Sequence, residues 1–208
     1  MSPRVEWLEV TGDPAVWRSI GFVIDGDGLI PLEGTALRIV PPTGGDRTGI
    51  VAWAISGIDE DLDGTEIDGL ATNVVDPQRP SFGDHRLGAS GLDHVVVLTP
   101  DLERTTGSIT AATGYELKRV REVGSMRQGF HRMGRGGLIV EVVTRPEIAA
   151  GPATFWGLVV NVDDLDQACA VIGDGRISPP KDAVQPGRRI ATISDEVGLG
   201  LPVALMTN

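Results

Sequence analysis

The sequence predicts an α+β fold assembled from repeated β-α-β-β-β units, and three observations carry this prediction. Residues 91–144 contain one complete unit: an apolar first strand, a helix that starts after Asp101, two middle strands and an apolar last strand. The same order of elements recurs over residues 155–207. The chain also has 28 glycines and 14 prolines, which supply the tight turns that many short strands require.

The chain begins with a strand followed by a helix. Residues 5–10 form a strand candidate, and Asp13 as N-cap with Pro14 at the first helical position indicates a helix. Asp-Gly and Glu-Gly turns then separate further strand candidates. These candidates are residues 22–24, 29–32 and 36–40. The first forty residues therefore fit one β-α-β-β-β unit.

A second unit starts with a strand at residues 50–55, and we interpret it as truncated. An acidic helix is expected over residues 59–70, after which residues 73–75 are the one β-like run before a turn-rich connector. We therefore expect residues 1–88 to be a degenerate N-terminal portion, with one unit plus a truncated unit and connector. Residues 89–208 are expected to form a paired-module domain.

The third and fourth units are complete. In the third unit, Leu102 and Ile109 lie on one helix face that ends near Gly114, and residues 115–120 and 127–133 supply the middle strands. The fourth unit is expected to follow the same order. Its elements are a strand at 155–162, a helix at 163–172, strands near 176–177 and 189–193, and a last strand at 201–206.

A fixed spacing relates these two units. Leu102 and Leu165 lie 63 residues apart, and so do Thr144 and Thr207, which makes internal duplication the simplest account. An isolated four-stranded sheet with one helix leaves one face bare. We therefore expect the two units to pair and to enclose a cavity between curved sheets.

Composition excludes several classes of function. The net charge is −11 and neither Lys nor Arg forms a run, so nucleic acid is excluded as the main partner. No apolar stretch approaches the roughly 20 residues of a membrane span, and the N-terminus has no secretory apolar region, so we expect a cytoplasmic protein with no membrane partner. The single cysteine, Cys169, lies at a core position of a helical pattern.

One carboxylate needs a chemical explanation. Glu141 interrupts the apolar strand of residues 138–143, and a buried carboxylate is costly unless it is paired, hydrogen-bonded or bound to a cation. His94 stands on the first strand of the same unit. A mutual ion pair or hydrogen bond between the two is the structural alternative to a functional site.

The run Leu92-Asp93-His94-Val95-Val96-Val97 on a first strand, with Leu138-Ile139-Val140-Glu141-Val142-Val143 on a fourth, resembles the vicinal oxygen chelate superfamily. This superfamily contains glyoxalase I, bleomycin-resistance proteins and extradiol dioxygenases. The resemblance covers residues 91–207 well and residues 5–90 weakly. It implies a glyoxalase-like, curved-sheet cup, often with a divalent metal such as zinc, nickel, iron or manganese held by a His and a Glu from each module.

Carried over to this chain, the resemblance implies His94 and Glu141 as metal ligands, with Glu141 also available as a catalytic base. The spacing of 63 residues places Gly157 and Ala204 at the partner positions, and neither can bind a metal. Two other donors are candidates for the missing ligands. They are Glu6, which aligns with His94 when Thr11 is matched to Thr99, and His85 in the connector.

Other side chains are candidate substrate contacts. We expect Arg127, Phe130 and Trp156 to bind substrate, although a solvated face for Arg127 and core packing for Trp156 are the structural alternatives. The register of the middle strand does not fix whether His131 faces the cup or solvent. No Ser-His-Asp or Cys-His arrangement and no nucleotide-binding glycine motif in a suitable context is present.

Three functions stay open on this basis. The first is a glyoxalase-like or dioxygenase-like enzyme in which a divalent metal at His94 and Glu141 polarises oxygens of a small metabolite. The second is a metal-free protein of the bleomycin-resistance type that binds or sequesters a small molecule. The third is a scaffold or oligomer contact module. The resemblance also allows a homodimer, because such modules pair across subunits as well as within a chain.

Overall fold

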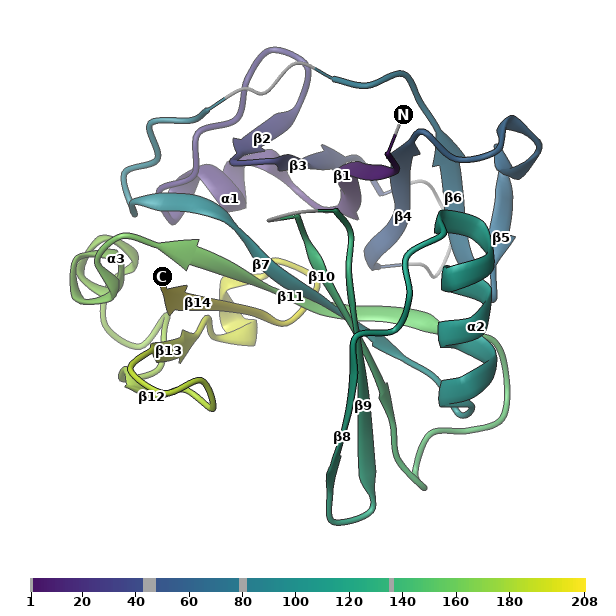
Figure 1. The fold of residues 1–208 in the computed structure, drawn as a ribbon. Coiled ribbons are helices and arrows are strands. Elements are labelled where there is room, and N and C mark those ends of the chain that lie inside the picture. Colours follow the sequence, from purple (N-terminus) through teal and green to yellow (C-terminus); the bar gives the residue numbers. More distant parts are fainter. Residues whose placement is uncertain (1, 43–47, 79–81, 135–136) are drawn as a thin grey trace.

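The structure, a computed structural model, describes residues 2–42, 48–78, 82–134 and 137–208, which form two mixed β-sheets with helices at their margins (Figure 1). The N-terminal sheet has strand order β2-β3-β1-β4-β6-β5, and the C-terminal sheet has order β12-β13-β14-β11-β7-β10-β9-β8. Mixed sheets with few helices confirm the predicted α+β class. No helix of the described residues is long and apolar enough to cross a membrane.

The N-terminal sheet contains two incomplete units. The first has β1 (Arg4–Thr11), α1 (Pro14–Ser19), β2 (Leu29–Leu32) and β3 (Thr35–Val40). The second has β4 (Gly49–Ser56), the 3-10 turn η1 (Glu60–Leu62), β5 (Thr65–Ile67) and β6 (Leu70–Val74). As predicted, Asp13 caps α1, and its side chain accepts a hydrogen bond from the amide of Ala15.

Two predictions for this half are wrong. Residues 22–24 are not a strand, because Phe22 and Ile24 are buried in the core and the amide of Val23 donates to Nδ1 of His85 instead of to a neighbouring strand. Residues 59–70 are not a helix. Gly64, Asp68 and Gly69 have φ values of 68°, 50° and 93°, and these left-handed residues turn the chain into a short β5–β6 hairpin.

The C-terminal sheet contains two complete units. The third unit has β7 (Ala89–Leu98), α2 (Leu102–Thr113), β8 (Arg119–Val123), β9 (Met126–Arg132) and β10 (Ile139–Thr144). The fourth has β11 (Thr154–Val162), α3 (Leu165–Ile172), β12 (Lys181–Asp182), β13 (Arg189–Thr192), the 3-10 turn η2 (Asp195–Val197) and β14 (Val203–Thr207). The strand expected at 176–177 is reduced to a single bridge at Ile177.

Sheet register reproduces the 63-residue repeat. Glu141 lies opposite Val96 on the parallel pair β10/β7, and Ala204 lies opposite Val159 on the pair β14/β11. The helices also start alike, because the N-cap side chain of Asp101 accepts from the amide of Arg104 just as that of Asp164 accepts from Gln167. The sequence repeat is therefore also a repeat of hydrogen-bonding geometry.

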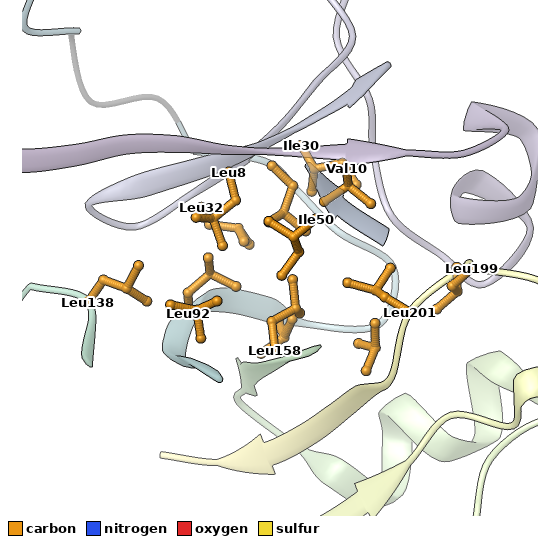
Figure 2. Close-up of a cluster of buried hydrophobic side chains, with 14 of the residues drawn as sticks. Leu8, Val10, Ile30, Leu32, Ile50, Leu92, Leu138, Leu158, Leu199 and Leu201 are labelled. Carbon is orange, nitrogen blue, oxygen red and sulfur yellow. The ribbon is translucent and has the colours of Figure 1, made fainter. Parts of the chain in front are cut away.

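One buried core joins the two sheets. Leu8, Val10, Ile30, Leu32 and Ile50 come from the N-terminal sheet and face side chains of the C-terminal half (Figure 2). Those facing side chains are Leu92, Leu138, Leu158, Leu199 and Leu201. Strand β7 begins at Ala89, and the buried core runs without a break between residues on either side of that position.

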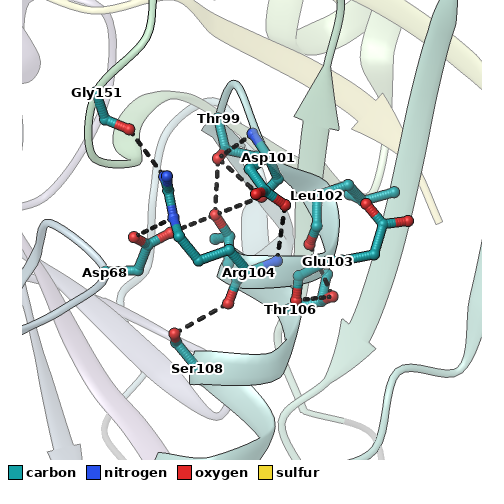
Figure 3. Close-up of polar contacts among 10 residues, drawn as sticks. Asp68, Thr99, Asp101, Leu102, Glu103, Arg104, Thr106, Ser108 and Gly151 are labelled. Carbon is teal, nitrogen blue, oxygen red and sulfur yellow. Dashed lines mark hydrogen bonds and ion pairs between the residues drawn. The ribbon is translucent and has the colours of Figure 1, made fainter.

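A polar network ties the β5–β6 turn to α2 (Figure 3). The Nε of Arg104 lies 2.7 Å from the carboxylate of Asp68, and the same guanidinium donates to the carbonyl of Gly151 at 2.8 Å. The hydroxyl of Thr105 donates to Asp68. Helix α2 is thus fixed at its N-terminus to both halves of the molecule, which holds the third unit against the N-terminal sheet.

Candidate functional site

The C-terminal sheet curves around a cavity of about 350 Å³. Strands β7, β9 and β10 of the third unit form one wall, and β11, β13 and β14 of the fourth unit form the other. Most of the lining is apolar. The polar lining residues are His94, Gln128, Glu141, Arg145 and Thr192. A mainly apolar cavity with a few convergent polar groups is the usual form of a small-molecule site.

His94 is held by its sequence neighbour Asp93. Val159 and Val160 of β11 pair with His94 and Leu92, so Asp93 is the unopposed residue of a β-bulge. Successive strand side chains normally point to opposite faces, and a bulge breaks that alternation. The Asp93 carboxylate therefore reaches Nδ1 of His94 at 2.7 Å.

Arg188 of the fourth unit supports Asp93 from the other side. Its guanidinium donates to Asp93 at 2.6 Å, to the side-chain oxygen of Asn161 at 2.6 Å and to the carbonyl of Thr207 at 2.5 Å. Burial alone would raise the pKa of Asp93, but hydrogen bonds from His94 and Arg188 outweigh it and hold that pKa below its usual value. Asp93 is therefore an ionised acceptor that fixes a proton on Nδ1 of His94.

Glu141 completes the polar wall. Its side chain is 12% exposed, its Oε1 accepts from Nε2 of Gln128 at 2.5 Å, and its Oε2 lies 3.4 Å from Nε2 of His94. With Nδ1 of His94 donating to Asp93, the lone pair of a neutral imidazole would face the carboxylate. This geometry is stable when one positive charge, a proton or a cation, lies between the two groups.

The opposite wall cannot supply the partner ligands of a symmetric metal site. Gly157 stands where the repeat would place a histidine, and a Cβ there would lie 2.6 Å from the carbonyl oxygen of Pro202. Ala204 stands where the repeat would place a glutamate. The close approach of Gly157 to Pro202 means that this half is built around the absence of a side chain.

The structure does not bring Glu6 and His85 to His94. Glu6 accepts hydrogen bonds from Arg4, Ser56 and the amide of Gln78 within the N-terminal half. Nδ1 of His85 accepts from the amide of Val23, and Nε2 lies 2.8 Å from the carbonyl of Pro31. Among the described residues, no group of three or more His, Cys, Asp or Glu side chains is arranged to hold a metal.

Of the three expected substrate contacts, one lines the cavity. Trp156 lines the cavity. Phe130 stands opposite Glu141 in the sheet but stacks against the guanidinium of Arg119 and does not line the cavity. Arg127 lies on the α2 side, where it pairs with Glu103 at 2.6 Å. His131 also lies on that side and is fully buried, with Nδ1 near the carbonyl of Tyr115.

Three residues that contribute to the site were not predicted from the sequence. They are Asp93, Arg188 and Gln128. The signal for Gln128 was present, because it alternates with Met126 on the same cavity face. The role of Asp93 depends on a bulge, and that of Arg188 on contacts across two units, which no local pattern shows.

His94 and Glu141 are spaced as two ligands of a divalent metal would be. Two ligands about 2.1 Å from a tetrahedral metal lie roughly 3.4 Å apart, which matches the distance from Nε2 of His94 to Oε2 of Glu141. A ligating histidine commonly donates its other N–H to a carboxylate, as His94 does to Asp93. Oε1 of Gln128 is buried and has no hydrogen-bond partner among the described residues. The third unit thus fits a site of two strong donors and one weak donor.

Comparison with known proteins supports the fold. A triple mutant of 4-hydroxymandelate synthase from Streptomyces coelicolor is similar with a TM-score of 0.66 and 14% identity, over 98% of this chain and 92% of that chain. Methylmalonyl-CoA epimerase from Mycobacterium tuberculosis is similar with a TM-score of 0.48 and 16% identity, over 58% of this chain and 89% of that chain. Neither a protein-family model nor a curated protein matches the sequence.

The likeness to the synthase extends over nearly the whole chain. At this level of identity it shows the fold. The predicted glyoxalase-like arrangement of paired modules is therefore confirmed. Proposals for a substrate or a metal depend on the geometry of the site.

Proposed function

We propose that the C-terminal cup binds a small organic molecule with a mainly apolar body, and that His94 and Glu141 hold a proton at the polar end of that molecule. The observation that carries this proposal is the convergence of His94, Gln128 and Glu141 on one wall of an otherwise apolar cavity of about 350 Å³. A carboxylate beside an imidazole that is oriented by a second carboxylate is suited to proton transfer. Glu141 is the base in this proposal, and His94 orients and neutralises it.

A metal is not required for this function. Catalytic divalent sites usually have three protein ligands and an open position, whereas the fourth unit offers Gly157 and Ala204. The proposal therefore groups this protein with metal-free binding or proton-transfer members of its fold.

The cavity itself is tested with a neutral apolar fluorophore, N-phenyl-1-naphthylamine. Ala204 lines the cavity and Val184 is 71% exposed outside its lining, so Ala204→Phe and Val184→Phe form a matched pair. We expect fluorescence titration to show binding to the wild type, at least tenfold weaker binding to Ala204→Phe, and no change for Val184→Phe. Equal binding to all three proteins would contradict a site in the cup.

A divalent-metal site is the second candidate function. It is favoured by the 3.4 Å separation of Nε2 of His94 and Oε2 of Glu141, and by Oε1 of Gln128, which has no hydrogen-bond partner in the part of the chain that the structure describes. These three side chains would hold the ion, which would polarise an oxygen of the bound molecule. The protein is incubated separately with zinc, nickel, iron or manganese, desalted and measured for metal content. Stoichiometric metal that is lost in both His94→Ala and Glu141→Ala but kept in Asp166→Asn would establish this candidate and overturn the metal-free proposal.

A further inference from the structure

The cavity lining changes in character from its floor to its mouth. At the floor, the side chains of His94 and Glu141 are 15% and 12% exposed. At the mouth, the side chain of Arg145 is 52% exposed and Trp156 is 49% exposed. Valine, leucine, isoleucine and methionine side chains make up most of the remaining lining. A bound molecule therefore meets a carboxylate at one end and a guanidinium at the other.

Strand β10 sets the spacing of the two ends. Glu141, Val143 and Arg145 alternate along one face of the strand and its extension, and all three line the cavity. Four residues of extended chain span roughly 13 Å, so the Cα atoms of Glu141 and Arg145 are separated by about the length of a bicyclic ring with a short side chain.

Arg145 has little to hold it within its own chain. Its ion pair with Glu147 is loose, with Nε 3.9 Å from the carboxylate, and both side chains are more than half exposed. Exposed pairs of this kind contribute little and exchange readily for a better partner. An arginine fork binds a carboxylate through two parallel hydrogen bonds, which is the partner best suited to this position.

Trp156 gives the mouth an aromatic surface. It is the unopposed residue of a bulge in β11, the repeat counterpart of Asp93, and the bulge places its indole at the cavity instead of in the core. An exposed tryptophan beside an apolar cavity provides a flat face for the body of a ligand.

Glu141 fixes the orientation of any charged ligand. Because the proton shared with His94 only balances the Glu141 carboxylate, the floor has no free positive charge for an anionic group, whereas a hydroxyl or N–H group can donate to Glu141. We infer that the ligand is an amphipathic organic anion, with a hydrogen-bond donor at Glu141 and His94, an apolar and preferably aromatic body against Trp156, and a carboxylate at Arg145. This inference rests on the proposed function, because it assigns an orientation and a charge to the molecule in the same cup.

Three probes that differ in one group test the inference. 3-(6-Hydroxynaphthalen-2-yl)propionate carries a hydroxyl at one end of a bicyclic ring and a carboxylate beyond the other end, and it is compared with the analogues in which an alcohol or a primary amine replaces the carboxylate. Isothermal titration calorimetry is performed on the wild type, on Arg145→Gln and on Arg18→Gln, which removes the same charge from exposed α1 outside the cavity lining. The Trp156 indole resonance in NMR spectra of each titration reports whether the probe occupies the cup.

We expect the wild type to bind the carboxylate about tenfold more tightly than the alcohol, and the amine most weakly. The net charge of −11 attracts cations at long range, so a preference for the anion must arise locally. Arg145→Gln should bind the carboxylate and the alcohol equally, while Arg18→Gln should keep the wild-type order.

The possible results distinguish failure of this inference from failure of the proposed cup function. Binding in the cup with equal affinity for all three probes, or a carboxylate preference that survives in Arg145→Gln, overturns the inference and leaves the proposed cup function standing. Absence of binding by every probe at millimolar concentration, together with failure of the neutral fluorophore to bind, overturns both.

Discussion

The third and fourth units share a sequence spacing, a sheet register and paired bulges, yet they perform different tasks. At the first bulge the third unit has Asp93 followed by His94, and at the second the fourth unit has Trp156 followed by Gly157. On the last strands, Glu141 of the third unit corresponds to Ala204. The duplicated frame therefore keeps its geometry while one copy carries the polar chemistry and the other supplies an apolar wall.

The fourth unit also supports the chemistry of the third. Arg188, Asn161 and the carbonyl of Thr207 all belong to the fourth unit, and together they hold Asp93 and, through it, His94. The unit without polar side chains at these positions thus has a supporting role. The difference between the units can be tested by mutations that treat matched positions in the same way.

The largest expected effect is at Gly157. Gly157→Ala places a Cβ 2.6 Å from the carbonyl oxygen of Pro202, so we expect a loss of about 2–3 kcal/mol in the free energy of unfolding measured in urea. Gly107→Ala in the interior of α2 meets nothing within 4 Å and should gain about 0.5–1 kcal/mol. A Gly157→Ala protein as stable as the wild type would contradict the conclusion that this half is built around the absence of a side chain.

The second effect concerns the pair of Arg188 and Asp93, whose side chains are mostly buried. Arg188→Gln leaves the Asp93 carboxylate with fewer donors, and we expect a loss of about 2 kcal/mol in the free energy of unfolding. In a double-mutant cycle with Asp93→Asn, the two losses should not add, because both remove one interaction. Additive losses would contradict the supporting role of the fourth unit.

The comparison also separates what the sequence can predict from what it cannot. The helix starts at Leu102 and Leu165 follow from Asp N-caps and periodic apolar residues, which are local signals. A helix was wrongly predicted at residues 59–70 because acidic residues are typical of the first turn of a helix. The left-handed conformation of Asp68 has no signal in the sequence. Short strands such as β5 carry too few residues for a periodic signal.

The site divides in the same way. His94 and Glu141 were found because polar residues interrupt apolar strands, and burial makes such interruptions costly. Asp93 escaped notice because alternation assigns it to the other face, and the bulge that redirects it depends on pairing with β11. Arg188 precedes β13 and meets Asp93 only after two units pair, so its contribution is a property of the tertiary structure.

A smaller effect is expected from pH, through His131 on the α2 side of the third unit. Burial lowers the pKa of His131 below its ordinary value of 6.5, and Nε2 has no partner among the described residues. The unfolded chain then binds more protons, so stability is full above pH 6.5 and falls as the pH drops below that value.

This one histidine cannot change the free energy of unfolding by more than about 1.4 kcal/mol per pH unit. In His131→Leu, the free energy of unfolding measured in urea should depend less on pH between about pH 6.5 and 5 than it does in the wild type. The remaining slope there is expected from His85, whose pKa burial also lowers. An unchanged pH profile in His131→Leu would show that His131 is protonated without cost.

The smallest effect on stability is expected at two exposed ion pairs that occupy matching places in the third and fourth units. Glu103 of α2 pairs with Arg127, and its repeat counterpart Asp166 of α3 pairs with Arg189, so each helix is linked to a strand of its own unit. Hydrogen bonds from these arginines lower the pKa of both carboxyl groups. Any stabilisation from this shift is complete at a pH above the ordinary carboxyl pKa, and it is lost as the pH falls through the lowered pKa. Because both pairs are exposed, solvent and salt screen them. Glu103→Gln and Asp166→Asn should therefore leave the urea midpoint at neutral pH unchanged within error, and a clear shift in either one would show that its unit depends on the helix–strand link more than its copy does.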